Sequence, residues 1–190
     1  MKISTWAITL VLPLLLTGCA TTWVKVDDAG KHYQDEYYSV TLPIGWLRLD
    51  SNDSLTLSKD GILLQYISIQ HRPHEKAFEK IEKNSSSTML PSELAELTIA
   101  EFKATQDEGL PSLEILHNRP VELAGHTGFG IHFRYKTDAG LRVDMLLRGV
   151  VDESGFYLVK YSAPTLHYFE RNLQTYNSLT ESLKLLSGHR

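Results

Sequence analysis

The sequence predicts an α+β fold in which a largely antiparallel β-sheet is flanked by helices. Segments with alternating apolar and polar residues recur over 38–69 and again over 113–161, as expected for half-buried strands. Turn residues separate these segments at the short distances that antiparallel neighbours need. Apolar residues spaced three and four apart indicate helices in the middle of the chain and at its C-terminus. An antiparallel sheet can leave one face in water, so the helices need not cover both sides.

The N-terminal segment has the pattern of a lipoprotein signal peptide. Lys2 precedes an apolar stretch over 6–16, and the lipobox-like sequence Leu16-Thr17-Gly18-Cys19 follows. We expect cleavage before Cys19, followed by diacylglycerol on its sulfur and an acyl chain on its amino group. The apolar stretch is shorter than the roughly 20 residues of a membrane-spanning helix. Ala20 follows the cysteine in place of Asp, which by resemblance to Gram-negative lipoproteins favours the outer membrane over the inner one.

We divide the chain into a signal peptide over 1–18, a lipidated tether over 19–35 and a folded domain over 36–187. Cleavage before Cys19 leaves 172 of the 190 residues, which is enough for one domain with a sizeable core. Cleavage also removes Lys2, so the formal charge changes from −4 to −5. An acidic chain lacks the basic face that nucleic-acid binding requires. Cys19 is the only cysteine, so the mature domain has no disulfide and no thiolate metal site.

The first half of the domain is expected to begin with strands over 38–42 and 54–57, where apolar residues alternate with Ser and Thr. Asp60-Gly61 then favours a two-residue hairpin turn. Closing the hairpin there places Leu57 opposite Leu64, so the apolar faces of the two strands match.

A mostly helical region is expected over 74–107, interrupted by the polar residues 85–87. Pro91-Ser92-Glu93 has the composition of a helix start, with Ser92 as the N-cap and an acid in the first turn. The helical spacing that follows is that of Ala95, Ile99 and Phe102. A second helical stripe near the C-terminus consists of Leu166, Phe169, Leu173, Tyr176, Thr180 and Leu183.

The second half of the domain is expected to form a meander, with strands over 113–116, 129–135, 141–147 and 157–161. Asp138-Ala139-Gly140 joins two of these strands. A three-residue loop with Gly140 in the left-handed conformation places Tyr135 opposite Val143. A two-residue loop would pair Lys136 with Val143 and mismatch the faces, so we predict the longer loop.

Three segments resemble the Mog1/PsbP-like superfamily. Residues 38–46 resemble its opening strand with the proline, glycine and tryptophan that follow, and residues 59–65 resemble its first hairpin. Residues 157–183 resemble its closing strand and helix. The resemblance covers 36–186 and implies a sheet flanked by helices and a non-enzymatic binding or assembly role, such as nuclear-transport GTPase binding or photosystem stabilisation. No partner-binding motif of either branch is present, so the resemblance assigns no functional residue.

His71-Arg72-Pro73-His74-Glu75 contains two imidazoles, His71 and His74, that are candidate metal ligands. Pro73 prevents a regular helix across them, and no third ligand follows nearby. The alternative is a polar loop between a strand and a helix. Two other segments are interpreted as turns: Gly125–Gly130 lacks the lysine of a phosphate-binding loop, and 50–53 lacks the spacing of an EF-hand calcium loop.

Basic residues line the polar face of the meander and form a candidate docking face. The predicted register sets Arg134 opposite Asp144, a surface ion pair worth about 0–1 kcal/mol. It also sets two cations side by side, which is mildly unfavourable. The candidate docking residues are His132, Lys136, Arg142 and Arg148. One interpretation is a solvated sheet face, and the other is a surface that docks an acidic protein, peptidoglycan or lipid phosphates.

These observations predict a lipid-anchored envelope protein that acts as a non-enzymatic binding or assembly factor at the periplasmic face of the outer membrane. An envelope protein is the expected partner, and the membrane is contacted through the lipid on Cys19. No cofactor is expected besides that lipid. The alternatives are a periplasmic lipoprotein that binds a small ligand or a metal, or a hydrolase, although no spacing of serine, histidine and aspartate indicates a catalytic triad.

Overall fold

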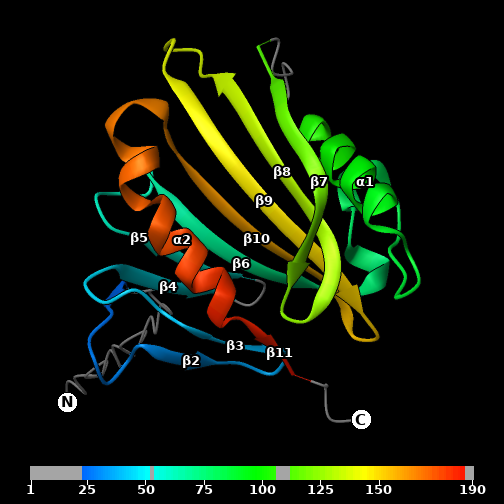
Figure 1. Cartoon of the computed structure of the whole chain (residues 1–190), viewed down its shortest axis with the longest axis horizontal. Helices are drawn as coiled ribbons and strands as arrows, with labels where there is room; N and C mark the ends of the chain where they lie inside the picture. Colours follow the sequence, from blue (N-terminus) through cyan, green and yellow to red (C-terminus); the bar gives the residue numbers. More distant parts are fainter. Residues whose placement is uncertain (1–22, 52–53, 106–111, 187–190) are drawn as a thin grey trace, which may run out of the picture.

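The computed structural model describes residues 23–51, 54–105 and 112–186. Within them, eight strands form one antiparallel sheet in the order β1-β4-β5-β6-β10-β9-β8-β7 (Figure 1). A second, three-stranded antiparallel sheet has the order β11-β3-β2. The strands are β1 (Val24–Lys25), β2 (His32–Gln34), β3 (Tyr38–Thr41), β4 (Leu47–Ser51), β5 (Ser54–Ser58), β6 (Tyr66–Arg72), β7 (Glu114–Leu123), β8 (His126–Lys136), β9 (Arg142–Asp152), β10 (Gly155–Pro164) and β11 (Lys184–Leu185).

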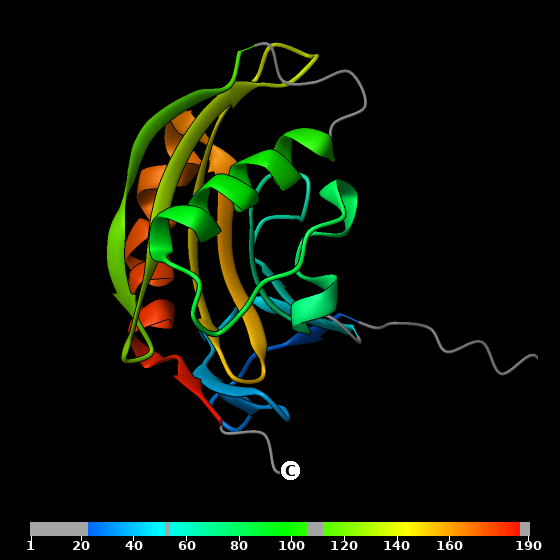
Figure 2. The ribbon, with the colours of Figure 1, turned by 90° about the vertical axis from the view of Figure 1, so that its right-hand side faces the viewer.

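Two α-helices cover opposite faces of the large sheet, α1 (Pro91–Ala104) and α2 (Glu170–Ser182). Figure 2 shows α1 on the near side of the sheet and α2 on the far side. The short turns η1 (His74–Lys76) and η2 (Glu79–Ile81) precede α1, and η3 (Thr165–Phe169) precedes α2. No helix in the described part of the chain is long and apolar enough to cross a bilayer. The predicted α+β class is confirmed.

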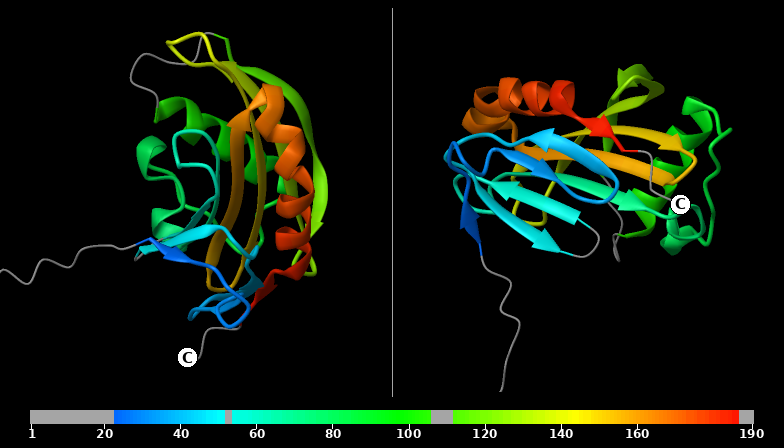
Figure 3. Two further views of the ribbon diagram at one scale, coloured as in Figure 1. Left: turned by 90° about the vertical axis from the view of Figure 1, so that its left-hand side faces the viewer. Right: turned by 90° about the horizontal axis from the view of Figure 1, so that it is seen from below.

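The alternation along the long strands divides the buried side chains between two cores. One core lies under α1 and includes Phe133 and Leu147, and the other lies under α2 and includes Tyr157 and Tyr161. Burying an aliphatic or phenylalanine side chain of this size contributes about 1.5–3 kcal/mol to stability. The small sheet belongs to the α2 core through Val40, and it lies at the C-terminal end of α2 (Figure 3).

The predicted register of the β8–β9 hairpin is confirmed. Tyr135 pairs with Val143, and the loop is closed by a hydrogen bond of 2.9 Å from the Thr137 N–H to the Leu141 carbonyl. Gly140 has a φ of +77°, the left-handed conformation that the three-residue loop requires. The alternation of both strands fixes this register because a slip by one residue would turn every apolar side chain outward.

The predicted two-residue hairpin at Asp60-Gly61 is wrong. Leu57 pairs with Ile67 and not with Leu64, so the connection between β5 and β6 is a longer loop over 59–65. The loop is held by the fully buried Gln65, whose amide nitrogen donates to Asp60 at 2.6 Å and whose amide oxygen accepts from Asn172 of α2 at 2.6 Å. This contact with a distant helix outweighs the local turn preference.

The predicted tether over 19–35 is too long, because β1 is already part of the folded domain. Val26 is buried, and its N–H donates to the Trp46 carbonyl at 2.8 Å while its carbonyl accepts from the Gly45 N–H at 2.9 Å. Strand β2 then pairs with β3. Residues 24–34 therefore belong to the domain, and the predicted boundary at 36 moves toward the N-terminus.

The region expected to be mostly helical contains two short turns and then α1. The helix begins at Pro91 with Leu90 as its N-cap, so the prediction of Ser92 as the cap is wrong. Proline suits the first helical position because its missing N–H needs no partner there. The Glu93 carboxylate accepts a hydrogen bond of 2.9 Å from the Leu90 N–H and thereby caps the helix from within.

The C-terminal helix starts later than its apolar stripe predicts. Leu166 is 83% exposed and precedes the helix, and His167 has a φ of +73°, which interrupts the helical backbone within η3. The rest of the stripe packs as expected, with buried side chains at Phe169, Tyr176, Thr180 and Leu183.

Candidate functional site

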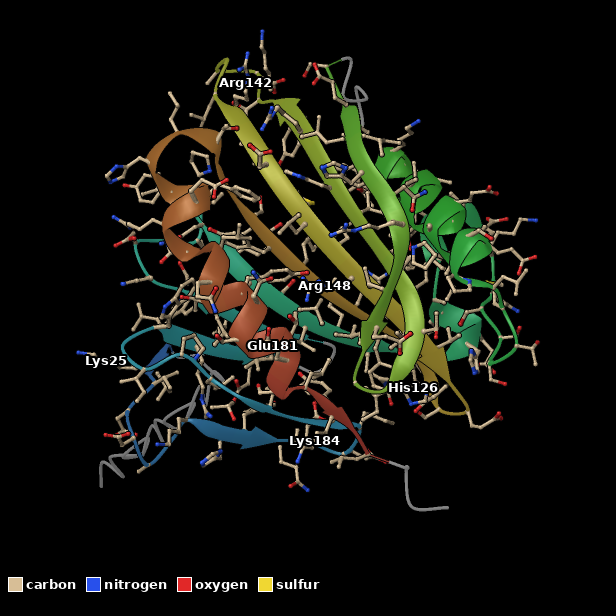
Figure 4. All side chains as sticks on the ribbon, viewed as in Figure 1. Lys25, His126, Arg142, Arg148, Glu181 and Lys184 are labelled. Atoms are coloured by element: carbon tan, nitrogen blue, oxygen red, sulfur yellow. The ribbon has the colours of Figure 1, made fainter. Side chains whose placement is uncertain are left out.

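The four predicted docking residues do not form one continuous surface. Lys136 and Arg142 face each other at the exposed end of the β8–β9 hairpin, whereas His132 and Arg148 lie next to η3 and α2. Arg142 and Arg148 are six residues apart on β9, which corresponds to about 20 Å along the strand. Figure 4 shows them at separate places on the molecule. Helix α2 therefore divides the predicted face into an exposed end and a partly covered end.

His132 belongs to a buried polar cluster rather than to an open face. Its Nε2 lies 2.6 Å from Oδ1 of the fully buried Asp144, which also accepts hydrogen bonds from Arg134 and from the Thr165 hydroxyl. The His132 ring stacks on Phe169 with centroids 5.3 Å apart. The expected surface ion pair between Arg134 and Asp144 is thus a buried one. This cluster fastens η3 to the sheet.

Burial alone would raise the pKa of Asp144. The hydrogen bonds from Thr165, Arg134 and His132 outweigh burial and hold the pKa below its ordinary value. The carboxylate is therefore charged at neutral pH although no water reaches it.

Arg148 lies under α2 and is held there by neutral groups. Its two terminal nitrogens donate to Thr180 Oγ1 at 2.6 Å and to Asn177 Oδ1 at 3.0 Å. Its guanidinium lies 5.2 Å from the centre of the Tyr176 ring, within the range of a cation–π contact. Among the described residues, no carboxylate lies within 4.0 Å of this guanidinium. Arg148 is a partly buried cation without an anion.

A pocket of about 400 Å3 opens beside Arg148. Its walls come from the last turn of α2, the start of β11 and the turn between β7 and β8. Ala124 and Gly125 form that two-residue turn with φ of +53° and +82°, the left-handed values that a type I′ turn needs. The predicted glycine-rich segment thus contributes a turn, and its remaining residues continue into β8. The side chains that line the pocket include Arg148, Glu122, Glu181 and Lys184.

The rim of this pocket carries charges of both signs. Lys184 and Glu181 make no side-chain hydrogen bond or ion pair with another described residue, and both are exposed. Figure 4 shows Glu181 on the last turn of α2, with Lys184 beyond it and His126 across from both. A guanidinium presents a planar fork of N–H donors that matches a carboxylate or phosphate. The pocket is therefore suited to a single anionic group at Arg148, with Lys184 adding attraction, while Glu122 and Glu181 select against extended negative charge.

The two candidate metal ligands are engaged separately. His71 Nε2–H donates to the Ser154 carbonyl at 3.1 Å, and His74 Nδ1 lies 2.8 Å from the Ser85 hydroxyl. Burial lowers the pKa of His71, so its imidazole is neutral near pH 7. Within the described ranges, no group of three His, Cys, Asp or Glu side chains is placed to hold a metal ion.

A serine, a histidine and an aspartate do meet near the β9–β10 turn, but not as a catalytic triad. The Ser154 hydroxyl donates to Asp152 Oδ1 at 2.7 Å and lies 2.6 Å from the Tyr157 hydroxyl. His71 contacts the Ser154 backbone carbonyl and not the hydroxyl. The imidazole is thus not positioned to take the serine proton, as a triad requires.

Comparisons with known proteins identify the fold. No family model and no curated protein matches the sequence. Among solved structures, cyanobacterial PsbP (CyanoP) from Synechocystis superposes with a TM-score of 0.54 at 12% identity, over 82% of this chain and 91% of that one. A Bacteroides thetaiotaomicron protein gives 0.53 at 9% identity, over 83% of this chain and 48% of that one, so the chain spans about half of its length. The fold is Mog1/PsbP-like.

The yeast Ran-binding protein Mog1p superposes with a TM-score of 0.49 at 9% identity, over 86% of this chain and 94% of that one. The Mog1/PsbP-like fold assigns no site, so the site depends on this chain's own residues. The sequence indicated Arg148 and the Gly125 turn but missed Glu181 and Lys184. Their only signal is their position at the end of the helical stripe, and nothing local indicates that β11 pairs with β3 and lies near the turn between β7 and β8. Cys19 lies outside the described residues.

Proposed function

We propose that the protein is a lipid-anchored cell-envelope protein that acts as a non-enzymatic binding or assembly factor at the periplasmic face of the outer membrane. The lipobox at Leu16-Thr17-Gly18-Cys19 and the residue Ala20 support the anchor and its location. A diacylglyceryl group together with an N-acyl chain provides the two hydrophobic attachments that stable anchoring needs. The lipid then keeps the domain close to partners in the same membrane and raises their effective concentration.

The observation that carries the binding role is the Arg148 pocket. A guanidinium that is partly buried and has no carboxylate of the described residues within 4.0 Å lies at the wall of an open pocket, whose rim carries Lys184 together with Glu122 and Glu181. We infer that the pocket receives an acidic side chain or a C-terminal carboxylate of an envelope protein. Charge-assisted hydrogen bonds of this kind are about twice as strong as neutral ones.

A binding role also agrees better with the polar groups than a hydrolase does. The cluster of Ser154, His71 and Asp152 lacks the hydrogen bond between imidazole and hydroxyl that a catalytic triad needs. The fold neighbour CyanoP is a PsbP protein, and its likeness concerns the fold alone.

The anchor is tested by replacing Cys19 with serine in the full-length protein. We expect the unmodified protein to sediment with membranes and the Cys19→Ser variant to appear in the soluble periplasmic fraction. Labelling with a radioactive fatty acid should give signal for the unmodified protein alone. Persistent membrane attachment of the variant would contradict the lipid anchor.

The docking pocket is tested by crosslinking in cells, affinity capture and mass spectrometry. Lys184→Glu reverses a charge at the rim and leaves the internal contacts intact, so we expect it to reduce capture of a specific envelope protein by about fivefold or more. Lys25→Glu is the matched control, because Lys25 is also exposed and lies away from the pocket (Figure 4).

The double reversal of Lys136 and Arg142 to glutamate tests the other end of the predicted face. If this double variant failed to capture the partner and Lys184→Glu still captured it, the docking site would lie at the β8–β9 hairpin. Equal capture by all variants would refute docking through either group of charges.

A further inference from the structure

A second cavity lies where the small sheet meets the large one, and among the described residues it shares no lining residue with the Arg148 pocket. It has a volume of about 150 Å3. Its walls come from β2, β3 and the segment between them on one side, and from the end of β4, the start of β5 and the end of β6 on the other. The side chains that matter below are Tyr33, Asp35, Tyr37, Tyr38 and His71.

Four of the eight described residues that line this cavity are aromatic. Tyr37 stacks on His71 with ring centroids 3.7 Å apart and an interplanar angle of 16°. The His71 ring is fixed further by Tyr157, at 4.8 Å. Tyr33 and Tyr38 lie 6.1 Å apart. The face of an aromatic ring carries partial negative charge, so a wall of tyrosines attracts cations.

The charge at the cavity is negative. Among the described residues that line it, Asp35 is the one with a formal charge. Its Oδ1 accepts hydrogen bonds of 2.8 Å from the N–H groups of Tyr37 and Tyr38, which hold the carboxylate in place. Burial, with a contribution from Asp35, raises the pKa of Tyr38, so this phenol stays neutral.

The charged groups that act on His71 are also negative. Burial lowers the pKa of His71, and the carboxylates that act against this effect are Asp152, Asp35 and Glu36. The neighbouring cation is Arg48, which lies 5.5 Å from the Tyr33 ring centre and 3.6 Å from Asp50. That arginine has its own carboxylate, so it does not neutralise Asp35.

We propose that this cavity binds an alkylammonium or quaternary ammonium group, held by the partly exposed rings of Tyr33 and Tyr37 and by the carboxylate of Asp35. The volume agrees with this class of ligand, because a cavity of about 150 Å3 accommodates a group the size of benzene. Aromatic cages beside an acidic side chain recognise such cations through cation–π attraction and charge. A sugar chain or a peptide segment exceeds the space, whereas the head of a long amine fits. The proposal does not depend on the anchor or on the Arg148 pocket.

The test uses choline as the cation and 3,3-dimethylbutan-1-ol as its neutral isostere. Both are titrated into the full-length protein, and binding is followed by NMR chemical shifts and by calorimetry. We expect choline to bind at least about tenfold more tightly than the neutral isostere, because shape is matched and charge differs. Equal binding of the two would mean that the cavity is merely apolar and would overturn the proposal, as would no choline binding up to about 10 mM.

Asp35→Asn separates the charge from the fold. The asparagine oxygen keeps the acceptor for the two N–H groups, so we expect an unchanged unfolding curve and a loss of at least about tenfold in choline affinity. Asp28→Asn is the matched control, since Asp28 is exposed and lies outside the cavity. Tyr33→Leu provides a second variant that keeps an apolar side chain and removes a ring. It should weaken the binding of choline more than the binding of the neutral isostere. Equal affinity of wild type and Asp35→Asn, or equal weakening by Asp28→Asn, would refute the site.

Discussion

Replacing Asp144 with alanine should destabilise the protein more than any other single change to a charged residue described here. The carboxylate is fully buried, lies 2.6 Å from His132 Nε2 and 3.0 Å from an Arg134 nitrogen, and accepts a hydrogen bond from Thr165. Removing one partner of a buried ion pair leaves the other groups without compensation and costs about 3–5 kcal/mol. For a chain of this size each kcal/mol lowers the Tm by about 2–4 °C, so we expect a decrease of about 6–20 °C.

The assays are thermal unfolding, which gives the Tm, and urea unfolding, which gives the free energy of unfolding, both at pH 7 with Asp50→Ala as the control. Asp50 pairs with Arg48 at 3.6 Å on the surface, where an ion pair contributes about 0–1 kcal/mol. If Asp144→Ala lowered the free energy of unfolding by no more than the control does, the reasoning would be refuted. The dependence on pH gives a second check. Since the pKa of Asp144 is depressed in the folded state, its contribution is present above the unfolded pKa of about 3.9 and is lost as the pH falls through the folded pKa. The difference in the free energy of unfolding between wild type and Asp144→Ala should therefore become smaller below about pH 4.

Three further changes have outcomes that urea unfolding can check. The Tyr176 hydroxyl is buried without a hydrogen-bond partner among the described residues, so Tyr176→Phe should stabilise the protein by about 1 kcal/mol. A loss of stability would mean that the hydroxyl does make a hydrogen bond. Lys136 lies opposite Arg142, so Lys136→Glu should raise the free energy of unfolding by about 0.2–1 kcal/mol. This gain in stability should disappear at high salt. A Cβ on Gly155 would lie 2.3 Å from the Arg72 carbonyl oxygen, so Gly155→Ala should cost more than about 1 kcal/mol; a neutral result would contradict the close approach.

The sequence predicted those parts of the fold in which local pattern and tertiary packing agree. The β8–β9 register followed from alternation and from Gly140, because both strands are half-buried and the loop length fits. The β5–β6 register was mispredicted because the buried Gln65 depends on Asn172, more than 100 residues away. Strands β1 and β2 resemble a tether in sequence because two- and three-residue strands carry no measurable alternation, and the burial of Val26 depends on Trp46.

The candidate site was less predictable than the fold. Alternation correctly placed His132 and Arg148 on the polar face of the sheet, but it gives no information on where a helix crosses that face. Helix α2 covers Arg148 and leaves Arg142 exposed. Lys184 and Glu181 complete the pocket only because β11 returns to pair with β3. Such meetings of distant segments depend on topology and not on composition.

The position of Arg148 couples the pocket to the seating of α2. The arginine bonds Thr180 and Asn177, and its guanidinium has more N–H donors than these two bonds use. An incoming carboxylate can therefore engage Arg148 without releasing the helix, and the bonds to α2 hold the guanidinium in its binding geometry beforehand. Substituting Arg148 removes both roles together, so it lowers stability as well as capture. Lys184→Glu affects capture alone, and comparing the two variants in unfolding and in capture separates the anchoring of the helix from the binding of a partner.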